Sequence, residues 1–384
     1  MSEPIIKLVY AHNSLTERGG AERKMLLLAK HFAAVPGVNL EIMVHGLNPD
    51  KTFKEYLTGY PVRVFPASNP IAKYFALRRM GRAAQAADLI HAHNHPGHVA
   101  AVFAKRLQRK PILWFCNEPM LYLEGTKRRT SLWKLFLVRL FEKLILPQID
   151  QIVSNSENTR RNIKQYLKRD SVVIYSGVDT SSLVPDPERK PQARPQLVSL
   201  CRFTPEKNIN FVLRLAERCP EFDWVIAGNG PEEANLRRTI TEKKLSHVRL
   251  AVNIPEEEKV RLYQGSDVFI FPTLHEPLGI NIVEAMSCGV PTVAFNSGGA
   301  RETVMSGETG FLVDTEAEFE DKVRYLATHP AERQQFGVRA RARVIENFSL
   351  EQMINKTAGL YNQLLEKYGH PFRFNSVTDI KSVS

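Results

Sequence analysis

Residues 275–291 read HEPLGINIVEAMSCGVP and combine a loop, a short helix and a helix stop. Good helix formers predict a helix over 280–288, which Gly289 ends and which Pro291 prevents from continuing. The preceding run VFIFP is typical of a strand. Gly279 lies where the helix leaves its first N–H groups unpaired, and a glycine lets an anion approach the backbone closely. The stretch therefore predicts a main-chain phosphate site between a strand and a helix.

Two glutamates flank this predicted phosphate site. Glu276 lies in the loop before the cradle formed by Leu278, Gly279 and Ile280, and Glu284 lies more than one turn inside the helix. Carboxylates accept hydrogen bonds from sugar hydroxyls, so the spacing suits a nucleotide-sugar with its hexose toward one glutamate and its ribose toward the other. Two glutamates at this spacing are by themselves weak support, because many helices have such a pair by chance.

Short apolar runs alternate with helical patterns along the chain. IIKLVYA, LEIMVHG, ADLIHAHN and PILWFC read as strands in the first half, and QLVSLCRF, DWVIAGNG, VRLAV and VFIFP in the second. Strands that alternate with helices favour βαβ units and parallel sheets, which bind ligands beyond the carboxyl ends of their strands. We therefore predict two tandem doubly wound, Rossmann-like α/β domains that face each other across a cleft.

A proline-rich, charged segment without apolar periodicity separates the two domains. The predicted boundaries are residues 1–178 for the first domain, 179–195 for the linker and 196–349 for the second domain. A helix over about 350–368 is expected to pack back on the first domain, with a tail over 370–384.

Length and composition indicate a folded protein that does not cross a membrane. A chain of 384 residues is too long for one ordinary core, and no window approaches 18 uncharged apolar residues. The first 30 residues contain no apolar stretch of signal-peptide type. The four cysteines are scattered without metal-ligand spacing, which fits a reducing compartment and a cytoplasmic location.

Positive charge is concentrated in the first half of the chain. Residues 1–180 contain 27 Lys and Arg against 14 Asp and Glu, whereas residues 181–384 contain 25 against 27. A basic region of this kind attracts nucleic acid, anionic lipid or a phosphorylated substrate. The alternative is a charged surface with no specific partner. The chain lacks the signatures of common nucleic-acid-binding modules, and such a function leaves the paired glutamates unexplained.

Residues 127–146, KRRTSLWKLFLVRLFEKLIL, predict an amphipathic helix. Its polar residues fall within one arc of about 100°: Arg128, Arg139, Glu142 and Lys143. Core packing explains the apolar remainder without a membrane. However, the cations at 127–129 precede a helix N-terminus, where the dipole disfavours them. A basic segment with aromatic residues suits an anionic membrane surface, so we predict peripheral membrane contact.

A second group of motifs surrounds the opening stretch. After it come a strand, a Gly-Gly turn and a TGFLV strand. With these motifs the sequence resembles the retaining glycosyltransferases of family 4, which have the GT-B fold. Their C-terminal domain has the pattern E-x-x-G-[LI]-x3-E-A-M-x-x-G-x-P-V, followed by G-G and T-G-x-L-V. The matching residues here are Glu276, Gly279, Ile280, Glu284, Ala285, Met286, Gly289, Pro291, Gly298, Gly299, Thr309 and Gly310. Thr292 replaces the usual valine.

The resemblance extends over most of the chain. Gly19 and Gly20 begin a GGAE that matches the family's N-terminal loop near the donor phosphates and acceptor. SLCRFTPEKN matches the segment that supplies Arg202 and Lys207 to the diphosphate, although Cys201 replaces the commoner glycine. VIAGNGPE and SGVD match two further family segments. Each motif alone has an ordinary structural explanation, and their order along the chain makes them specific.

The resemblance implies a catalytic design that needs neither metal nor other cofactor. Arg202 and Lys207 would neutralise the leaving diphosphate, Glu276 would position the sugar, and Glu284 would accept hydrogen bonds from the ribose. Retaining members are described as using a front-face reaction in which the leaving phosphate helps to deprotonate the acceptor. The chain offers no DxD motif to hold a metal.

One position departs from the family. Many relatives have a histidine that contacts the donor sugar after the strand matching PILWFC, and here that position is Asn117. The cluster His91, His93 and His95 is a candidate replacement, with His93 or Asn117 contacting sugar or acceptor. The spacing of the three histidines also resembles metal binding, but the family commonly has HAHN without a metal, so we expect none.

Together these features predict a metal-independent, retaining hexosyltransferase. Its donor would be a nucleoside-diphosphate sugar, and its acceptor an anionic or lipid-linked saccharide of cell-envelope or exopolysaccharide synthesis, met at the inner face of the cell membrane. No nucleic-acid partner is expected. A GT-B sugar-phosphate enzyme that is not a transferase remains the alternative. A nicotinamide oxidoreductase is disfavoured because neither half has GxGxxG after its first strand.

Overall fold

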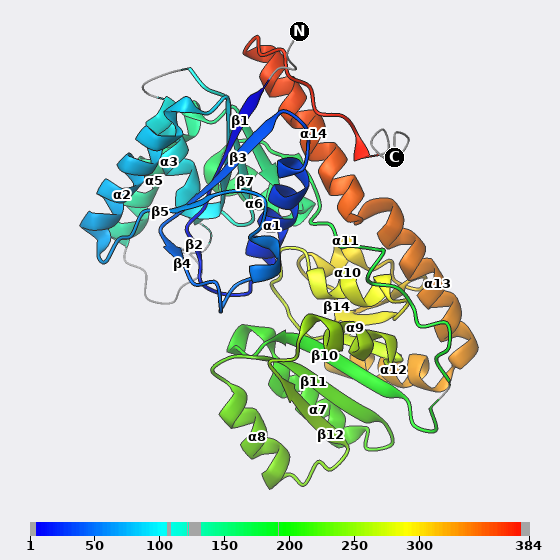
Figure 1. The fold of residues 1–384 in the computed structure, drawn as a ribbon. Helices are drawn as coiled ribbons and strands as arrows, with labels where there is room; N and C mark the ends of the chain where they lie inside the picture. The colour runs from blue at the N-terminus through cyan, green and yellow to red at the C-terminus, as the bar shows by residue number, and fades with distance from the viewer. Residues whose placement is uncertain (1–4, 106–108, 121, 123–131, 191, 378–384) are drawn as a thin grey trace. The chain divides into compact units, whose positions relative to one another are not determined.

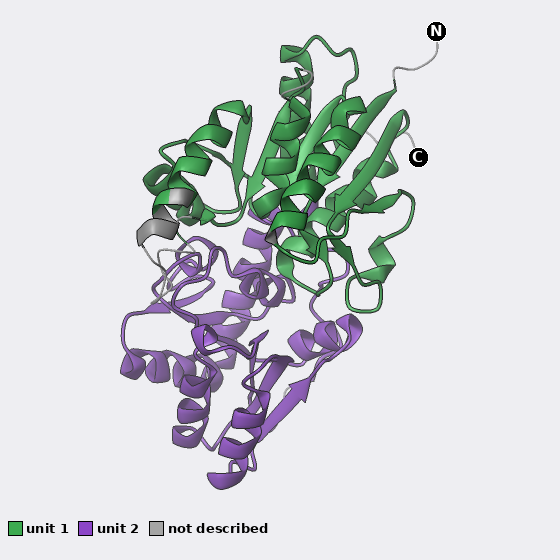
Figure 2. Cartoon of the chain, turned by 90° about the vertical axis from the view of Figure 1, so that its left-hand side faces the viewer, with its two compact units in different colours: residues 1–175, 353–384 green, residues 176–352 purple. Residues whose placement is uncertain are grey.

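The computed structural model describes residues 5–105, 109–120, 122, 132–190 and 192–377. The chain divides into two compact units, coloured separately in Figure 2: unit 1 runs to Tyr175 and resumes at Met353, and unit 2 is Ser176–Gln352. Within the described residues, unit 1 has a seven-stranded sheet and unit 2 a six-stranded sheet. Both sheets are parallel throughout, which confirms the predicted pair of α/β domains.

The sheet of unit 1 has the order β5-β3-β1-β6-β7-β8-β9. Its strands are β1 (Ile6–Ala11), β3 (Val38–Val44), β5 (Val62–Val64), β6 (Leu89–His93), β7 (Ile112–Cys116), β8 (Gln151–Ser154) and β9 (Val172–Val173). The short strands β2 (Ser14–Leu15) and β4 (Gly46–Leu47) form a separate pair. The winding direction reverses between β1 and β6, as in a dinucleotide-binding sheet.

Helices cover both faces of this sheet (Figure 1). They are α1 (Gly20–Ala33), α2 (Pro70–Ala83), α3 (Asn94–Lys105), α5 (Leu132–Ile145), α6 (Glu157–Leu167) and the end of α14 (Leu350–Lys367), with 3-10 turns η1 (Lys54–Tyr56), η2 (Ala84–Ala86) and η3 (Leu146–Gln148). Because side chains alternate along a strand, Val9 and Ala11 of β1 pack into a core with α2, α3 and α5, whereas Tyr10 points to the opposite face.

A buried polar node joins α14 to that opposite face. The Tyr361 hydroxyl is fully buried, lies 2.9 Å from the Tyr10 hydroxyl and also contacts Nδ1 of His91. The Tyr361 ring packs against Phe32 of α1, with ring centroids 5.0 Å apart. Since buried polar groups need partners, this node fixes how α14 lies on the sheet of unit 1.

The sheet of unit 2 has the order β12-β11-β10-β13-β14-β15. Its strands are β10 (Gln196–Arg202), β11 (Asp223–Asn229), β12 (Val248–Val252), β13 (Val268–Phe271), β14 (Thr292–Phe295) and β15 (Gly310–Val313). Its helices are α7 (Ile209–Arg218), α8 (Glu233–Glu242), α9 (Glu256–Gln264), α10 (Ile280–Ser287), α11 (Ala300–Thr303), α12 (Glu316–Thr328) and α13 (Pro330–Asn347), with a 3-10 turn η4 (Pro205–Lys207). The winding reverses between β10 and β13.

The segment 179–195, predicted as a linker, lies within unit 2. The carbonyl of Leu183 accepts hydrogen bonds from the side chains of Ser287 and Arg341, at 2.7 and 2.8 Å. Arg189 pairs with Asp267 at 2.9 Å. Polar side chains of unit 2 thus satisfy the backbone of a segment whose prolines prevent it from joining a sheet.

Helix α5 differs from the predicted amphipathic pattern. Glu142, predicted on the polar arc with Arg139 and Lys143, is buried. The outward side bears three exposed apolar residues besides Arg139 and Lys143: Phe136, Leu140 and Leu144. The predicted polar arc was wrong for Glu142, because the prediction assumed that the charged residues of the arc face solvent. The cations at 127–129 lie outside the described residues, and no helix of the described part is long and apolar enough to cross a membrane.

We expect Tyr361→Phe to destabilise unit 1. The substitution keeps the ring but leaves Tyr10 and His91 without their shared partner, which costs about 1–3 kcal/mol. Thermal unfolding followed by circular dichroism measures the change. Tyr74→Phe is the matched control, because Tyr74 is exposed on α2. Equal midpoints for the two variants would show that the node contributes nothing.

Candidate active site

The predicted donor residues of unit 2 gather where the strand order reverses. Arg202 ends β10 and Lys207 ends the η4 turn that follows, while Glu276 and Gly279 lie between β13 and α10. Because β10 and β13 are neighbours and parallel, their carboxyl ends open at the same edge. This edge is where doubly wound sheets bind ligands.

Lys207 and Glu276 form a direct ion pair across this edge, from Nζ to Oε2. Each side chain is about one-fifth exposed, at 21% and 22%. Arg202 ends the strand β10, and its side chain is exposed. The ion pair thus joins segments some seventy residues apart, and a further cation lies at the end of β10.

The N-terminus of α10 adds a main-chain donor site. Gly279 is the N-cap, with φ 81° and ψ 58°, and no side chain caps the helix. A Cβ at Gly279 would approach Cδ1 of Ile282 to 2.9 Å. The Asn281 amide donates to the carbonyl of Leu200 at 2.6 Å, which fixes the first turn to β10. Leu278 is buried and Ile280 half-buried, so this cradle presents backbone N–H groups rather than side chains.

Gly298 and Gly299 pack against the loop that contains Glu276. The N–H of Gly299 donates to the carbonyl of Glu276 at 2.8 Å. A Cβ at Gly299 would lie 2.3 Å from Cα of Leu278, and one at Gly298 would lie 2.6 Å from the Glu276 carbonyl oxygen. Backbone packs directly on backbone here, and only glycine permits that approach.

Glu284 lies within the same helix but is only 2% exposed. Its Oε1 accepts from Nζ of Lys259 at 3.0 Å, and its Oε2 from the Tyr263 hydroxyl at 3.0 Å. Burial and the Glu284 charge raise the pKa of Tyr263, which keeps its proton on the hydroxyl. The carboxylate keeps further acceptor capacity, so its role toward ribose stays a prediction. Lys259 was not predicted as a site residue, although a lysine on the inward side of α9 could have indicated it.

In unit 1 the corresponding edge lies beyond β1 and β6. Gly19 is the N-cap of α1, which begins at Gly20. The Glu22 carboxylate folds back over Gly19, where a Cβ would come within 2.1 Å of Oε2. Glu22 Oε1 lies 3.2 Å from Nε2 of His12, and Nδ1 of His12 donates to the carbonyl of His93. The predicted GGAE loop is thus fixed to the ends of both strands.

A buried lysine reaches Asn117 from α1. Lys24 is 4% exposed, and its Nζ donates to Oδ1 of Asn117 at 2.6 Å. Nζ also lies 4.9 Å from the ring centroid of Phe115. Burial lowers the pKa of Lys24 to about 8. Lys24 was not predicted as a site residue, although a lysine within the inward-facing apolar run KMLLLA could have indicated a buried cation.

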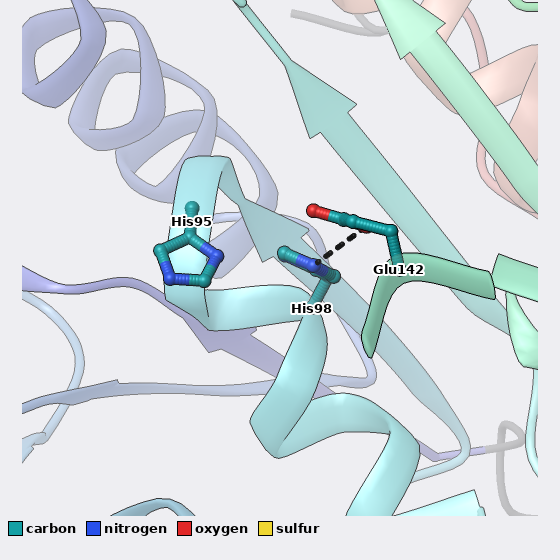
Figure 3. Close-up of side chains that lie close together, drawn as sticks. All are labelled: His95, His98 and Glu142. Carbon is teal, nitrogen blue, oxygen red and sulfur yellow. Dashed lines mark ion pairs between the residues drawn. The ribbon is translucent and has the colours of Figure 1, made fainter. Parts of the chain in front are cut away.

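The three histidines of HAHNH are separated. His91 and His93 lie on β6 and stack with ring centroids 4.1 Å apart, and burial lowers both pKa values well below the usual range. His95 lies beyond the strand, beside His98 and Glu142 (Figure 3). The triplet therefore does not converge on one ligand.

Comparisons with known proteins identify the family of the chain. A family model described as Glycosyltransferase Family 4 matches residues 18–182, and one described as Glycosyl transferases group 1 matches residues 183–343. The chain therefore belongs to the group 1, family 4 glycosyltransferases.

Two curated proteins of Mycolicibacterium smegmatis are among its relatives. A GDP-mannose-dependent alpha-(1-6)-phosphatidylinositol monomannoside mannosyltransferase is 37% identical in an alignment 158 residues long that covers 36% of this chain and 41% of that protein. Alpha-maltose-1-phosphate synthase is 26% identical over 73% of this chain and 80% of that protein. The first alignment thus spans less than half of the relative's length.

A solved structure shows the same fold. The Anabaena protein Alr3699/HepE in complex with UDP-glucose has a TM-score of 0.78 and 20% identity, covering 93% of this chain and 100% of that chain. Together with the family matches, this likeness identifies the pair of parallel-sheet domains as the GT-B fold.

Gly299→Ala is expected to disrupt the loop that holds Glu276. Its methyl group overlaps the backbone of Leu278, and such overpacking costs about 1–3 kcal/mol or more. Thermal unfolding of the purified variant measures the loss. The control Gly359→Ala lies on the exposed side of α14, where nothing lies within 4 Å, and should be neutral or stabilising. A Gly299→Ala protein as stable as that control would contradict the packing argument.

Proposed function

We propose that the protein is a retaining glycosyltransferase that moves a hexose from a nucleoside-diphosphate sugar to an anionic or lipid-linked saccharide. The observation that supports it most is the set of groups at one edge of unit 2. There, Lys207, Glu276 and exposed Arg202 lie beside an uncapped helix N-terminus. Cell-envelope or exopolysaccharide synthesis is the process that fits such an acceptor.

In this proposal the cationic edge stabilises the leaving diphosphate. The bond between the anomeric carbon and the β-phosphate oxygen breaks, and negative charge develops on that phosphate. Arg202, Lys207 and the first N–H groups of α10 are cationic or donor groups, and hydrogen bonds hold Lys207 and the first turn of α10 in place. Preorganised donors of this kind contribute the largest single term in many enzymes. Metal independence of the transfer step remains a prediction.

Glu276 would connect the phosphate and sugar ends of the site. Lys207 neutralises its carboxylate in the structure, and the ammonium has three donors. Lys207 can therefore bind a phosphate oxygen while it stays near Glu276, whose second oxygen accepts from a sugar hydroxyl. The new glycosidic bond would form on the same face of the sugar, and the acceptor proton would pass to the departing phosphate. Such a step depends on proximity and orientation rather than on a protein base.

The names of relatives suggest which donors to test. One relative is GDP-mannose-dependent, and the Anabaena structure holds UDP-glucose. A thermal-shift screen of nucleoside diphosphates and their sugars separates these possibilities, because a ligand that binds only the folded state raises its stability. Acceptor-dependent release of nucleoside diphosphate distinguishes a transferase from a sugar-phosphate enzyme of the same fold.

The acceptor is assigned to unit 1 on the basis of charge. Residues 1–180 contain 13 more basic than acidic residues. Both α2 and α5 expose basic and apolar side chains. The exposed basic residues are Arg78, Arg79 and Arg82 on α2 and Arg139 and Lys143 on α5. The exposed apolar residues are Ile71, Tyr74 and Phe75 on α2 and Phe136, Leu140 and Leu144 on α5. The opposite sides of both helices pack into one core. We propose that this outward surface, the α2–α5 surface, contacts an anionic membrane, where a lipid-linked acceptor would be found.

Arg202→Ala and Lys207→Ala are each expected to lower kcat by about 100-fold or more, because each removes a cation from the leaving group. Initial rates of nucleoside diphosphate release measure the effect. Arg237→Ala is the control, since Arg237 is exposed on α8 and pairs only with its helix neighbour Glu233. If both site variants keep half of the wild-type kcat, the assignment of this edge to the diphosphate is wrong.

Binding of the α2–α5 surface to lipid can be tested by vesicle sedimentation. Each cation near an anionic surface contributes on the order of 1 kcal/mol. Replacing Arg78, Arg79, Arg82, Arg139 and Lys143 with glutamine should abolish pelleting with anionic vesicles and leave nucleotide binding unchanged.

The control for that experiment replaces Arg237 and Arg238 on unit 2, which should pellet like the wild type. Neutral vesicles should bind no variant, and salt should release the wild type. Wild-type protein that stays in the supernatant with anionic vesicles at low salt would favour a soluble acceptor, such as a phosphorylated sugar.

A further inference from the structure

Three potential metal ligands meet in unit 1, in a group separate from the donor residues of unit 2. They are His95 and His98 at the beginning of α3 and Glu142 on α5 (Figure 3). One ligand atom from each lies within 4.8 Å of the others, and Nε2 of His98 lies 3.8 Å from Oε2 of Glu142. They are the one such group of three found within the described residues.

The carboxylate oxygens of Glu142 and Nε2 of His98 are buried without a hydrogen-bond partner among the described residues. Glu142 is 1% exposed, and neither of its carboxylate oxygens has a hydrogen-bond partner. Nε2 of His98 is buried and equally unpaired. A buried carboxylate without a donor is costly, and native proteins rarely leave one in this state. A bound cation would satisfy these atoms, as would a proton that Glu142 donates to Nε2 of His98.

The surroundings of His98 prepare its Nε2 for a metal. Nδ1 lies 3.4 Å from the carbonyl of Asn94, which only accepts, so the proton belongs on Nδ1 and the lone pair on Nε2. The ring stacks on Trp114, with centroids 4.1 Å apart and planes 25° apart, which fixes its orientation.

We propose that His95, His98 and Glu142 bind a single divalent transition-metal ion of the zinc type, which joins α3 to α5. Two imidazole nitrogens and one carboxylate oxygen are a donor set that zinc accepts, with ligand distances of about 2.0–2.2 Å. The groups must move somewhat closer together for that geometry, and half-buried His95 has room to rotate. Calcium and magnesium prefer all-oxygen sites and should not bind.

The site has a structural role in this proposal. Glu142 lies on the inner side of α5, whose outer side forms part of the α2–α5 surface. Metal binding would neutralise Glu142 and hold the inner side of this helix against α3. Metal binding to preformed ligands stabilises the folded state because the unfolded chain lacks the site. The inference concerns metal content and stability, and it does not depend on the transfer reaction.

The test uses the full chain without an affinity tag, stripped of metal with a chelator and then titrated with Zn²⁺. The wild type should retain one zinc per chain after gel filtration, measured by inductively coupled plasma mass spectrometry. Its thermal midpoint should rise by about 5 °C or more at a 100-fold excess of zinc over Kd. Mg²⁺ should produce no shift, and Co²⁺ should give the visible absorption bands of a four-coordinate site.

Glu142→Gln and His98→Gln should each lose at least about 100-fold in zinc affinity, since even second-shell changes cost about 10–100-fold. Metal-free Glu142→Gln should be at least as stable as the metal-free wild type, because the amide removes a buried charge. His329→Gln, an exposed position in unit 2, is the control and should bind zinc normally. Failure of the wild type to retain zinc, or equal zinc-induced shifts in Glu142→Gln and the wild type, would overturn the proposal.

Discussion

The reversal of strand order within each parallel sheet is the constraint on which the rest of the structure depends. In unit 2, β10 and β13 are hydrogen-bonded neighbours, but the chain leaves β10 toward α7 and leaves β13 toward α10. Right-handed crossovers send these two helices to opposite faces of the sheet. The carboxyl edge between them is therefore not crossed by a connection, and side chains from both segments meet there. The Lys207–Glu276 ion pair is a direct result.

The loop at this edge is shaped by backbone contacts more than by side chains. Gly279 has a left-handed conformation that begins α10, and Gly298 and Gly299 bring a second turn against the backbone of residues 276–278. Each contact excludes a Cβ. Positions of this kind can be read from a sequence, because the constraint acts on the residue type itself. For this reason the glycine pattern indicates the backbone geometry of this loop, while phosphate binding there stays a prediction.

Residues whose role depends on the direction of a side chain were predicted less well. Glu142 was placed on a polar face and is buried, and Lys24, which was not predicted as a site residue, is buried and donates to Asn117. His91 and His95 were grouped by spacing, but the strand ends between them, so they join different clusters. The alternation of strands and helices is enough to predict the fold class, because each element needs only one apolar side to pack against the core. Which charged residue turns inward depends on rotation of the helix and on packing against neighbours, and a single sequence does not contain that information directly.

Several polar side chains are buried in unit 1 near the carboxyl ends of β1, β6 and β7. In the Tyr10–Tyr361–His91 node the two hydroxyls and Nδ1 of His91 are hydrogen-bonded to one another, which holds α14, although Nε2 of His91 is buried without a hydrogen-bond partner among the described residues. Lys24 is different, because its charge is buried and its one hydrogen bond goes to Asn117. With a pKa of about 8, the ammonium stays largely protonated at neutral pH, although burial opposes this. The family resemblance implies a histidine at the Asn117 position in many relatives, and a histidine there would be largely neutral at the same pH. The pair of Asn117 and Lys24 thus places an acceptor and a largely protonated ammonium at this position, and the basic character of unit 1 extends from its surface into the site that we assign to the acceptor.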